Sequence, residues 1–234
     1  MDEKTCIPFT QVCFKNRFRY LFVSLLAMLV IGPFVEGFAY LQILFSVFLT
    51  AIFISAIYAI SQERRHTFIA SFLALPALGF TWATYFTDSI AFSLVSSFLG
   101  AVFFVFIAIN ILAFISQQDH VTADMIVGAA VVYLLMAMTW LTVYEIIETL
   151  HPGSFAMPEG QLRDSRYVFL YYSLVTITTL GYGDVTPLTS VASSFSALEA
   201  VVGQLYLVIS VAWLVGVHVS QSKNRRSPEN KPTP

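Results

Sequence analysis

The sequence predicts an all-α membrane protein with six transmembrane helices and one re-entrant segment. Its composition is the first reason: of 234 residues, 57% are hydrophobic and only 11% are charged, far from the composition of an ordinary soluble domain. The second reason is the distribution of the apolar residues. They fall into six long stretches and a seventh of about half that length, which leads directly into a glycine-rich motif.

Each long stretch approaches or exceeds the roughly 20 apolar residues that a helix needs to cross a hydrocarbon core of about 30 Å. In chain order they are Arg19–Val35, Phe38–Ile60, Thr67–Phe86, Ile90–Ile115, Val121–Thr149 and Val191–Ser220. The short stretch, Arg166–Thr178, cannot cross the core and is expected to be a re-entrant half-helix. Asp164 or Ser165 is expected to cap its first turn.

The basic residues predict that both termini are cytoplasmic, because Lys and Arg concentrate on the inner side of a membrane. Ten of the twelve lie before or at the start of the first span, between the second and third spans, or after the sixth. The loops around Glu36 and Asp88 carry none, and the re-entrant segment with the residues just before it carries only Arg163 and Arg166. We therefore expect a multi-pass protein of the cell membrane whose re-entrant segment opens outward.

These elements divide the chain into four parts. We expect a cytoplasmic N-terminal segment at 1–18, a four-helix membrane region at 19–118, a pore domain at 119–220, and a tail at 221–234 that is too short and polar to fold. No Lys or Arg occurs between Arg65 and Arg163. The four-helix region therefore lacks the membrane-embedded cations of a voltage sensor, and we expect it to serve as a scaffold.

The glycine-rich motif is the main functional signal. Residues 178–184 read Thr-Thr-Leu-Gly-Tyr-Gly-Asp. Irregular backbone at membrane depth is tolerated only where it is buried in protein or lines a water-filled cavity. Alternating glycines allow successive residues to take conformations of opposite hand, so that consecutive carbonyl oxygens can point the same way. A ring of such segments can replace the hydration shell of a cation, here with the carbonyls of Thr179, Leu180, Gly181 and Tyr182, in a filter that ends at Gly183.

The run from Tyr171 to Asp184 resembles the signature of the potassium channel superfamily. Leu180 departs from it, because family members more often carry Val or Ile there, but the carbonyl does the coordinating. The resemblance implies K⁺ as the permeant ion, with no other cofactor. It also implies a homotetramer, because each chain supplies one quarter of the filter.

The resemblance also implies the supports of the filter. Asp184 is expected to brace it against Tyr171, and Thr178 is expected to end the pore helix below it. A solvated acid at a loop tip is the alternative for Asp184. The best-studied bacterial members of the family carry Glu where this chain has Val175, so one brace is expected to be missing.

Gly203 lies twenty residues after the last filter glycine, where the family has the hinge of its inner helix. Close helix packing is the alternative for this glycine. By the same resemblance one face of the last span lines the cavity, and it comprises Gln204, Leu207, Val211, Ala212, Val215 and Val219. Below Gln204 this face is apolar, which would permit a gate that closes by dewetting.

Glu199 is an acid inside the apolar last span, and an intramembrane carboxyl is a functional hypothesis by default. Two positions stay open for this modulatory candidate. It lies behind the pore helix near Ser173 or Thr176, in protonated form, or it lies near the outer water layer. Glu145 and Glu148, at the outer end of the fifth span, either concentrate cations or belong to a solvated helix end.

The sequence therefore predicts a potassium-selective channel that conducts K⁺ passively across the lipid bilayer and is not conventionally voltage-gated. It shows no nucleophile–base set, metal cluster or phosphate loop, so we expect neither an enzyme nor a nucleic-acid partner. A weakly selective cation channel is the alternative within this class, and reversal potentials in K⁺ and Na⁺ separate the two. A transporter, which would saturate at low flux, and a non-conducting accessory subunit are the alternatives outside it.

Overall fold

The computed structural model describes residues 17–31, 41–61, 63–84, 86–87, 89–118, 122–157 and 166–226. These residues are largely helical, with two short strands in addition. The elements are α2 (Arg17–Ile31), α3 (Leu41–Ala59), α4 (Arg64–Ala83), α5 (Ile90–Ser116), α6 (Ala123–Leu150), β1 (Phe155–Ala156), α7 (Arg166–Ile177), β2 (Thr186–Pro187) and α8 (Ser190–Arg226).

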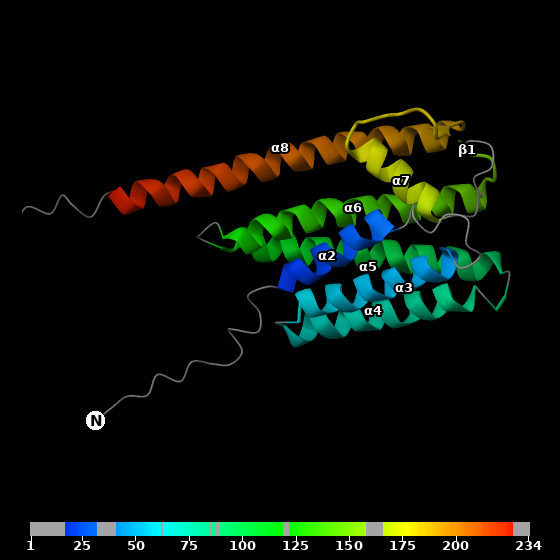
Figure 1. Ribbon diagram of the computed structural model, residues 1–234, viewed down its shortest axis with the longest axis horizontal. Coiled ribbons are helices and arrows are strands. Elements are labelled where there is room, and N and C mark those ends of the chain that lie inside the picture. Colours follow the sequence, from blue (N-terminus) through cyan, green and yellow to red (C-terminus); the bar gives the residue numbers. More distant parts are fainter. Residues whose placement is uncertain are drawn as a thin grey trace, which may run out of the picture.

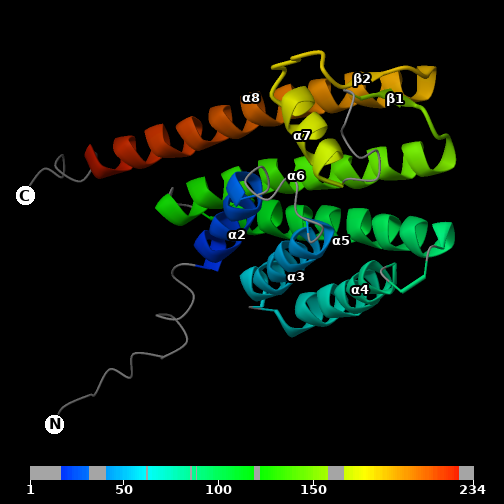
Figure 2. The same cartoon turned by 45° about the vertical axis from the view of Figure 1, so that its right-hand side comes forward.

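The long helices run side by side, with α5 and α6 in the middle, α2, α3 and α4 on one side, and α8 on the other (Figure 1). The short α7 lies between α6 and α8 (Figure 2). One end of the bundle holds the start of α2, the end of α3, the start of α4, the end of α5, the start of α6 and the end of α8 (Figure 1). This arrangement agrees with the alternating topology that the basic residues indicate, whereas the side of the membrane that this end faces stays a prediction.

Four of the described helices are long and apolar enough to cross a membrane: α4, α5, α6 and the Ser190–Val217 part of α8. The apolar parts described for α2 and α3 are shorter. The predicted spans Arg19–Val35 and Phe38–Ile60 extend into residues outside the described ranges. The structure thus supports an all-helical membrane protein, and the count of six spans stays a prediction.

Two helices are longer than the sequence predicted. Helix α4 begins at Arg64 rather than Thr67, because its first turn is built from polar residues that lie outside the apolar stretch. Helix α8 continues to Arg226 instead of ending at Ser220, so residues 221–226 of the predicted unfolded tail are helical. Extending an existing helix avoids the cost of nucleation, which explains why a short polar segment can join it. The rest of the tail lies outside the described residues.

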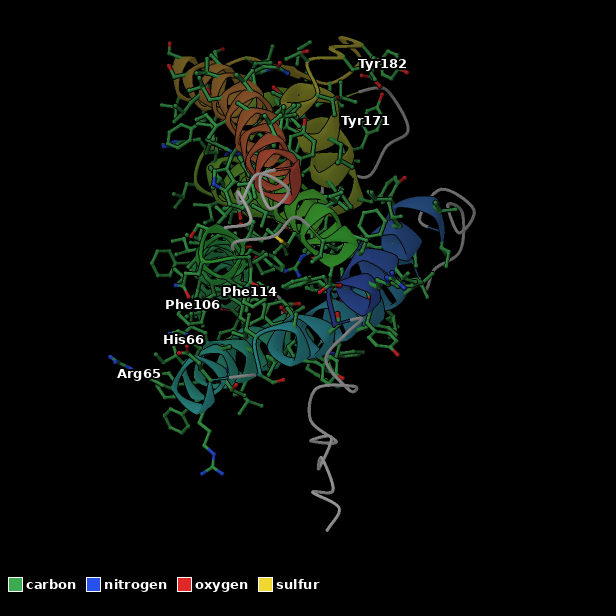
Figure 3. The ribbon with its side chains drawn as sticks, turned by 90° about the vertical axis from the view of Figure 1, so that its left-hand side faces the viewer. Arg65, His66, Phe106, Phe114, Tyr171 and Tyr182 are labelled. Carbon is green, nitrogen blue, oxygen red and sulfur yellow. The ribbon has the colours of Figure 1, made fainter. Side chains whose placement is uncertain are left out.

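The N-terminal helices pack on α5 through aromatic side chains. Phe53 of α3 stacks on Phe103 of α5, with ring centroids 4.1 Å apart. His66, in the first turn of α4, meets Phe106 edge to face at 6.3 Å, while the neighbouring Arg65 extends away from the helices (Figure 3). Helix α5 in turn packs closely on α6, with Gly100 facing the side chain of Thr142. The four-helix region is therefore joined to the outer helix of the predicted pore domain through α5, and α2 packs on that helix as well, with Phe18 against Gly128.

Candidate functional site

The glycine-rich motif forms a loop between α7 and α8. Helix α7 runs only part of the way along α6 and α8, and the chain after it returns to the end of the bundle from which α7 started (Figure 1). Strands β1 and β2 secure the returning chain, with Phe155 paired to Pro187 and Ala156 to Thr186. The predicted re-entrant segment is thus a half-length helix followed by a loop, and the proposed caps Asp164 and Ser165 lie outside the described residues.

The backbone of the motif alternates in hand, as a row of aligned carbonyls requires. The φ angles of Thr179, Gly181 and Gly183 are 58°, 59° and 77°, and no positive φ occurs at the residues between them. A positive φ is costly for side chains other than glycine, so Thr179 is strained and the two glycines relieve strain at the other positions. The N–H groups of Leu180 and Gly181 turn back to the Val175 carbonyl at 2.9 and 3.3 Å.

The carbonyl oxygens of the motif are left free for another partner. Within the described part of the chain, those of Thr179, Leu180, Gly181 and Tyr182 accept no hydrogen bond from the protein. Leu180 and Tyr182 also expose their side chains, at 55% and 66%. A segment with consecutive unused oxygens can coordinate a cation when several copies surround an axis. The assignment of Thr179–Gly183 as an ion-binding filter stays a prediction.

The two residues predicted to brace the filter are in contact. The Tyr171 hydroxyl donates to Asp184 Oδ2 at 2.7 Å, and the Val185 N–H donates to Oδ1 at 3.0 Å. The hydrogen bond from Tyr171 lowers the pKa of the Asp184 carboxyl. Tyr171 and Tyr182 lie on one side of α7 (Figure 3). Both oxygens of Asp184 have partners, but the residue is exposed in the single chain, so its role as a brace stays a prediction.

The other residues at the base of the motif belong to α7 or follow it directly. The Thr178 hydroxyl donates to the Leu174 carbonyl at 2.6 Å and so closes the last turn of the helix. Val175 is buried, and no acid stands at this position of α7. The acid that lies behind α7 comes from α8 instead.

Glu199 lies behind the pore helix, the first of the two positions left open by the sequence. It is fully buried. Its Oε1 lies 2.5 Å from Ser173 Oγ of α7, and its Oε2 accepts from the Tyr144 hydroxyl of α6. Tyr144 also belongs to an aromatic cluster with Phe155 and Tyr172. The carboxyl thus connects three helices at the back of the filter loop.

Gly203 is a point of close approach between α8 and α7. A Cβ added there would lie 2.5 Å from Ile177 Cγ1 and 2.8 Å from the Ile177 carbonyl oxygen. The same carbonyl accepts a hydrogen bond from Tyr133 of α6 at 3.0 Å. Helix α8 is continuous through Gly203. Close packing is the reading that this geometry supports, and a hinge role stays a prediction.

The face predicted to line the cavity is exposed in the single chain. It comprises Gln204, Leu207, Val211, Ala212, Val215 and Val219. Exposure does not single it out, because Leu198 and Ile209, which the helical period places on a different side of α8, are exposed at 51% and 64%. An apolar helix with so few contacts within its own chain needs lipid or other chains around it. Which face lines the cavity stays a prediction.

A polar cluster that the sequence did not reveal joins α5 to the start of α7. Arg166 Nε lies 2.9 Å from Glu145 Oε1, and Ser97 Oγ donates to Glu145 Oε2 at 2.9 Å. The Arg166 guanidinium also donates to Ser96 Oγ at 3.3 Å. Glu145 is therefore paired rather than solvated, and Glu148 accepts from the Gly153 N–H at 2.8 Å. The only signal in the sequence was that charges of opposite sign occur near the predicted outer ends of two neighbouring elements.

The helices around the glycine-rich loop belong to a stretch that matches a known protein family. Residues 121–218 match the model of a family described as an ion channel. The matched stretch includes α6, α7, the filter loop and most of α8, which are the elements that build the geometry described above. No curated protein matches the chain. The match confirms the resemblance to the potassium channel superfamily for this part of the chain.

Proposed function

We propose, from the premise that residues 121–218 belong to the ion channel family, that this chain is a potassium-selective channel. It conducts K⁺ passively, through a filter formed by Thr179–Gly183. The observation that carries the proposal is the alternating backbone of this segment, with positive φ at every second residue. Alternation of this kind allows successive carbonyl oxygens to point to one side, as K⁺ coordination requires.

The proposal includes a homotetramer. One chain supplies a single row of carbonyl oxygens, which cannot surround a dehydrated ion. Identical chains usually share a site through closed cyclic symmetry, and a filter of this kind is built from four loops. The largely uncovered α8 supports this assembly, because its exposed apolar side chains leave a large surface for other chains around the axis and for lipid.

The second part of the proposal concerns the cytoplasmic end of the pore. If the face with Val211 and Val215 converges at the axis, its apolar side chains form a constriction that closes by dewetting. Both side chains are exposed in the single chain, at 58% and 56%. Replacing Val215 by Asp would hydrate such a constriction and raise the basal flux.

The test of conduction is uptake of Rb⁺ into liposomes that contain the purified protein, together with reversal potentials in K⁺ and Na⁺ gradients. We expect Rb⁺ and K⁺ to permeate well and Na⁺ to permeate poorly. Equal permeability of K⁺ and Na⁺ would favour the weakly selective cation channel. Flux that saturates at low rate would favour a transporter.

A matched pair of glycine variants tests the role of the filter. Gly181 and Gly153 both have a positive φ, 59° and 85°, and a Cβ would have open space at either position. Alanine therefore introduces a similar backbone strain of about 1–2 kcal/mol at each. We expect Gly181→Ala to abolish selective flux and Gly153→Ala, in the outer loop, to retain it. Equal effects of the two would mean that the Gly181 backbone has no special role.

A further inference from the structure

Ser173 of α7 makes more oxygen–oxygen contacts than its single hydroxyl proton can serve. Its Oγ lies 2.5 Å from Glu199 Oε1 and 2.9 Å from the carbonyl oxygen of Ala137. Both distances lie within hydrogen-bonding range. Glu199 Oε2 has its own partner in the Tyr144 hydroxyl. Three oxygen–oxygen contacts therefore need three protons.

The hydroxyl groups supply only two of these protons. A serine hydroxyl carries a single proton, and a backbone carbonyl can only accept. If Ser173 donates to Ala137, the contact between Ser173 and Glu199 must contain a proton that belongs to Glu199. With that proton on Oε1, and with Tyr144 donating to Oε2, all three contacts are hydrogen bonds. An ionised Glu199 would leave one of them without a proton.

The charges around Glu199 support the same conclusion. Its side chain is fully buried, and the titratable groups that face it are the hydroxyls of Tyr133 and Tyr144 from α6 and Tyr172 from α7. On its own helix, α8, Ser196 lies three residues before Glu199, and its hydroxyl contacts that of Tyr172 at 2.6 Å. None of these groups is a cation.

The nearest basic side chain of α7 is engaged elsewhere, because Arg166 pairs with Glu145 at 2.9 Å. An isolated carboxylate within a membrane protein is strongly unfavourable, and such a group neutralises instead. Proton number and local charge are independent observations, and both indicate a neutral acid.

We infer that Glu199 is a proton-binding site. The neutral carboxylic acid donates to Ser173 and accepts from Tyr144, and it thereby ties α6, α7 and α8 together directly behind the filter. Hydroxide in an alkaline medium removes this proton and leaves a carboxylate, which can only accept. Ser173 must then turn its single proton from Ala137 to Glu199, so this hydrogen bond between α7 and α6 is lost and the pore helix is held less firmly.

The first test does not depend on conduction. An infrared difference spectrum is recorded between the wild-type protein and Glu199→Gln, both full length and in lipid, at neutral pH. We expect the wild type to show the carbonyl stretch of a protonated carboxylic acid, which shifts in D₂O and is absent from the variant. Carboxylate bands in its place would overturn the inference. Glu148→Gln is the matched control, because Glu148 accepts from a backbone N–H of the outer loop.

The second test uses Rb⁺ flux and rests on the proposed function. The amide of Glu199→Gln can donate to Ser173 and accept from Tyr144, so we expect flux close to that of the wild type. Glu199→Ala leaves two buried hydroxyl groups without this partner, and we expect flux to fall about tenfold or more. Raising the pH should reduce wild-type flux but not that of the Gln variant.

The two tests separate the possible failures. If the infrared spectrum shows the protonated acid but the protein passes no Rb⁺, the proton site is supported and the proposed conduction is overturned. The infrared spectrum could also show the protonated acid while high pH reduces Rb⁺ flux equally in the wild type and in Glu199→Gln. That result would show that the proton does not control the filter. Loss of flux in Glu199→Gln at neutral pH, equal to that in Glu199→Ala, would contradict the donor role assigned to the acid.

Discussion

Replacing Gly203 by alanine should separate packing from hinge motion. The added Cβ would lie 2.8 Å from the Ile177 carbonyl oxygen and 2.5 Å from Ile177 Cγ1. A backbone oxygen cannot move aside as a flexible side chain can, so α8 must shift away from α7. Overpacking of this kind costs about 1–3 kcal/mol, while alanine in place of glycine within a helix gains up to about 1 kcal/mol.

Gly79→Ala is the matched control, because Gly79 lies within α4 and a Cβ there meets nothing within 4 Å. It should show only the gain in helix propensity. The two variants should therefore differ by the packing cost of about 1–3 kcal/mol, with Gly203→Ala the less stable. At roughly 2–4 °C per kcal/mol for a chain of this size, their melting temperatures in detergent should differ by several degrees.

Ile177→Ala provides the decisive comparison, since it removes Cγ1 while leaving the carbonyl. If the two residues clash, the double variant Gly203→Ala/Ile177→Ala should be less destabilised than the sum of the single variants. Flux should follow the same pattern, because Ile177 ends the helix that precedes the filter. Additive effects, or a Gly203→Ala protein that is as stable as Gly79→Ala yet opens less often, would refute the packing argument and favour a hinge.

Three further predictions follow from other contacts. Tyr171→Phe removes the 2.7 Å hydrogen bond to Asp184. The loss should cost about 1 kcal/mol and speed inactivation of Rb⁺ flux. The pKa of Asp184 is lowered from 3.8 by this bond, so the bond is fully present above that value and is lost only as the pH falls through the lowered pKa. The difference between wild type and variant should therefore be constant from about pH 8 to pH 5 and shrink only in stronger acid; a difference that vanishes near neutral pH would contradict the assignment. Arg166→Gln and Glu145→Gln should each lower thermal stability, and the double variant should be less affected than their sum, with a coupling of about 1–3 kcal/mol for a pair exposed at 22% and 11%. Single-channel recordings should show open probability that depends weakly on voltage, because residues 90–115 carry no charge; an activation curve with several gating charges per subunit would contradict this.

The glycine-rich loop between α7 and α8 has a local structure that follows closely from its own residues. Glycines at 181 and 183 permit the positive φ values observed there, so the alternation of the backbone could be expected from the residues alone. The contact between Tyr171 and Asp184 could be expected as well, by resemblance to a known signature. Both depend on residues close together in the chain, where spacing restricts the geometry strongly.

The sequence predicted where the long helices lie better than where they end. The apolar stretches identified the long helices, because the length needed to cross a bilayer is visible in composition. Their ends were missed at Arg64 and Arg226, where polar residues continue a helix beyond its apolar part. Hydropathy reports the solvent that a segment prefers and not the hydrogen bonds that its backbone makes.

The sequence by itself determined the composition of a membrane protein, the order of its helices and the alternating backbone of the glycine-rich loop, because these follow from apolar composition, segment length and local backbone freedom. Only the tertiary structure decided the partners of the buried acids. Glu199 meets Ser173 and Tyr144, and Glu145 meets Arg166. Such pairs join elements far apart in the chain, and which side chains meet depends on how the helices cross and rotate against one another. That rotation is set by packing across the whole bundle, as at Gly203, and no single segment encodes it.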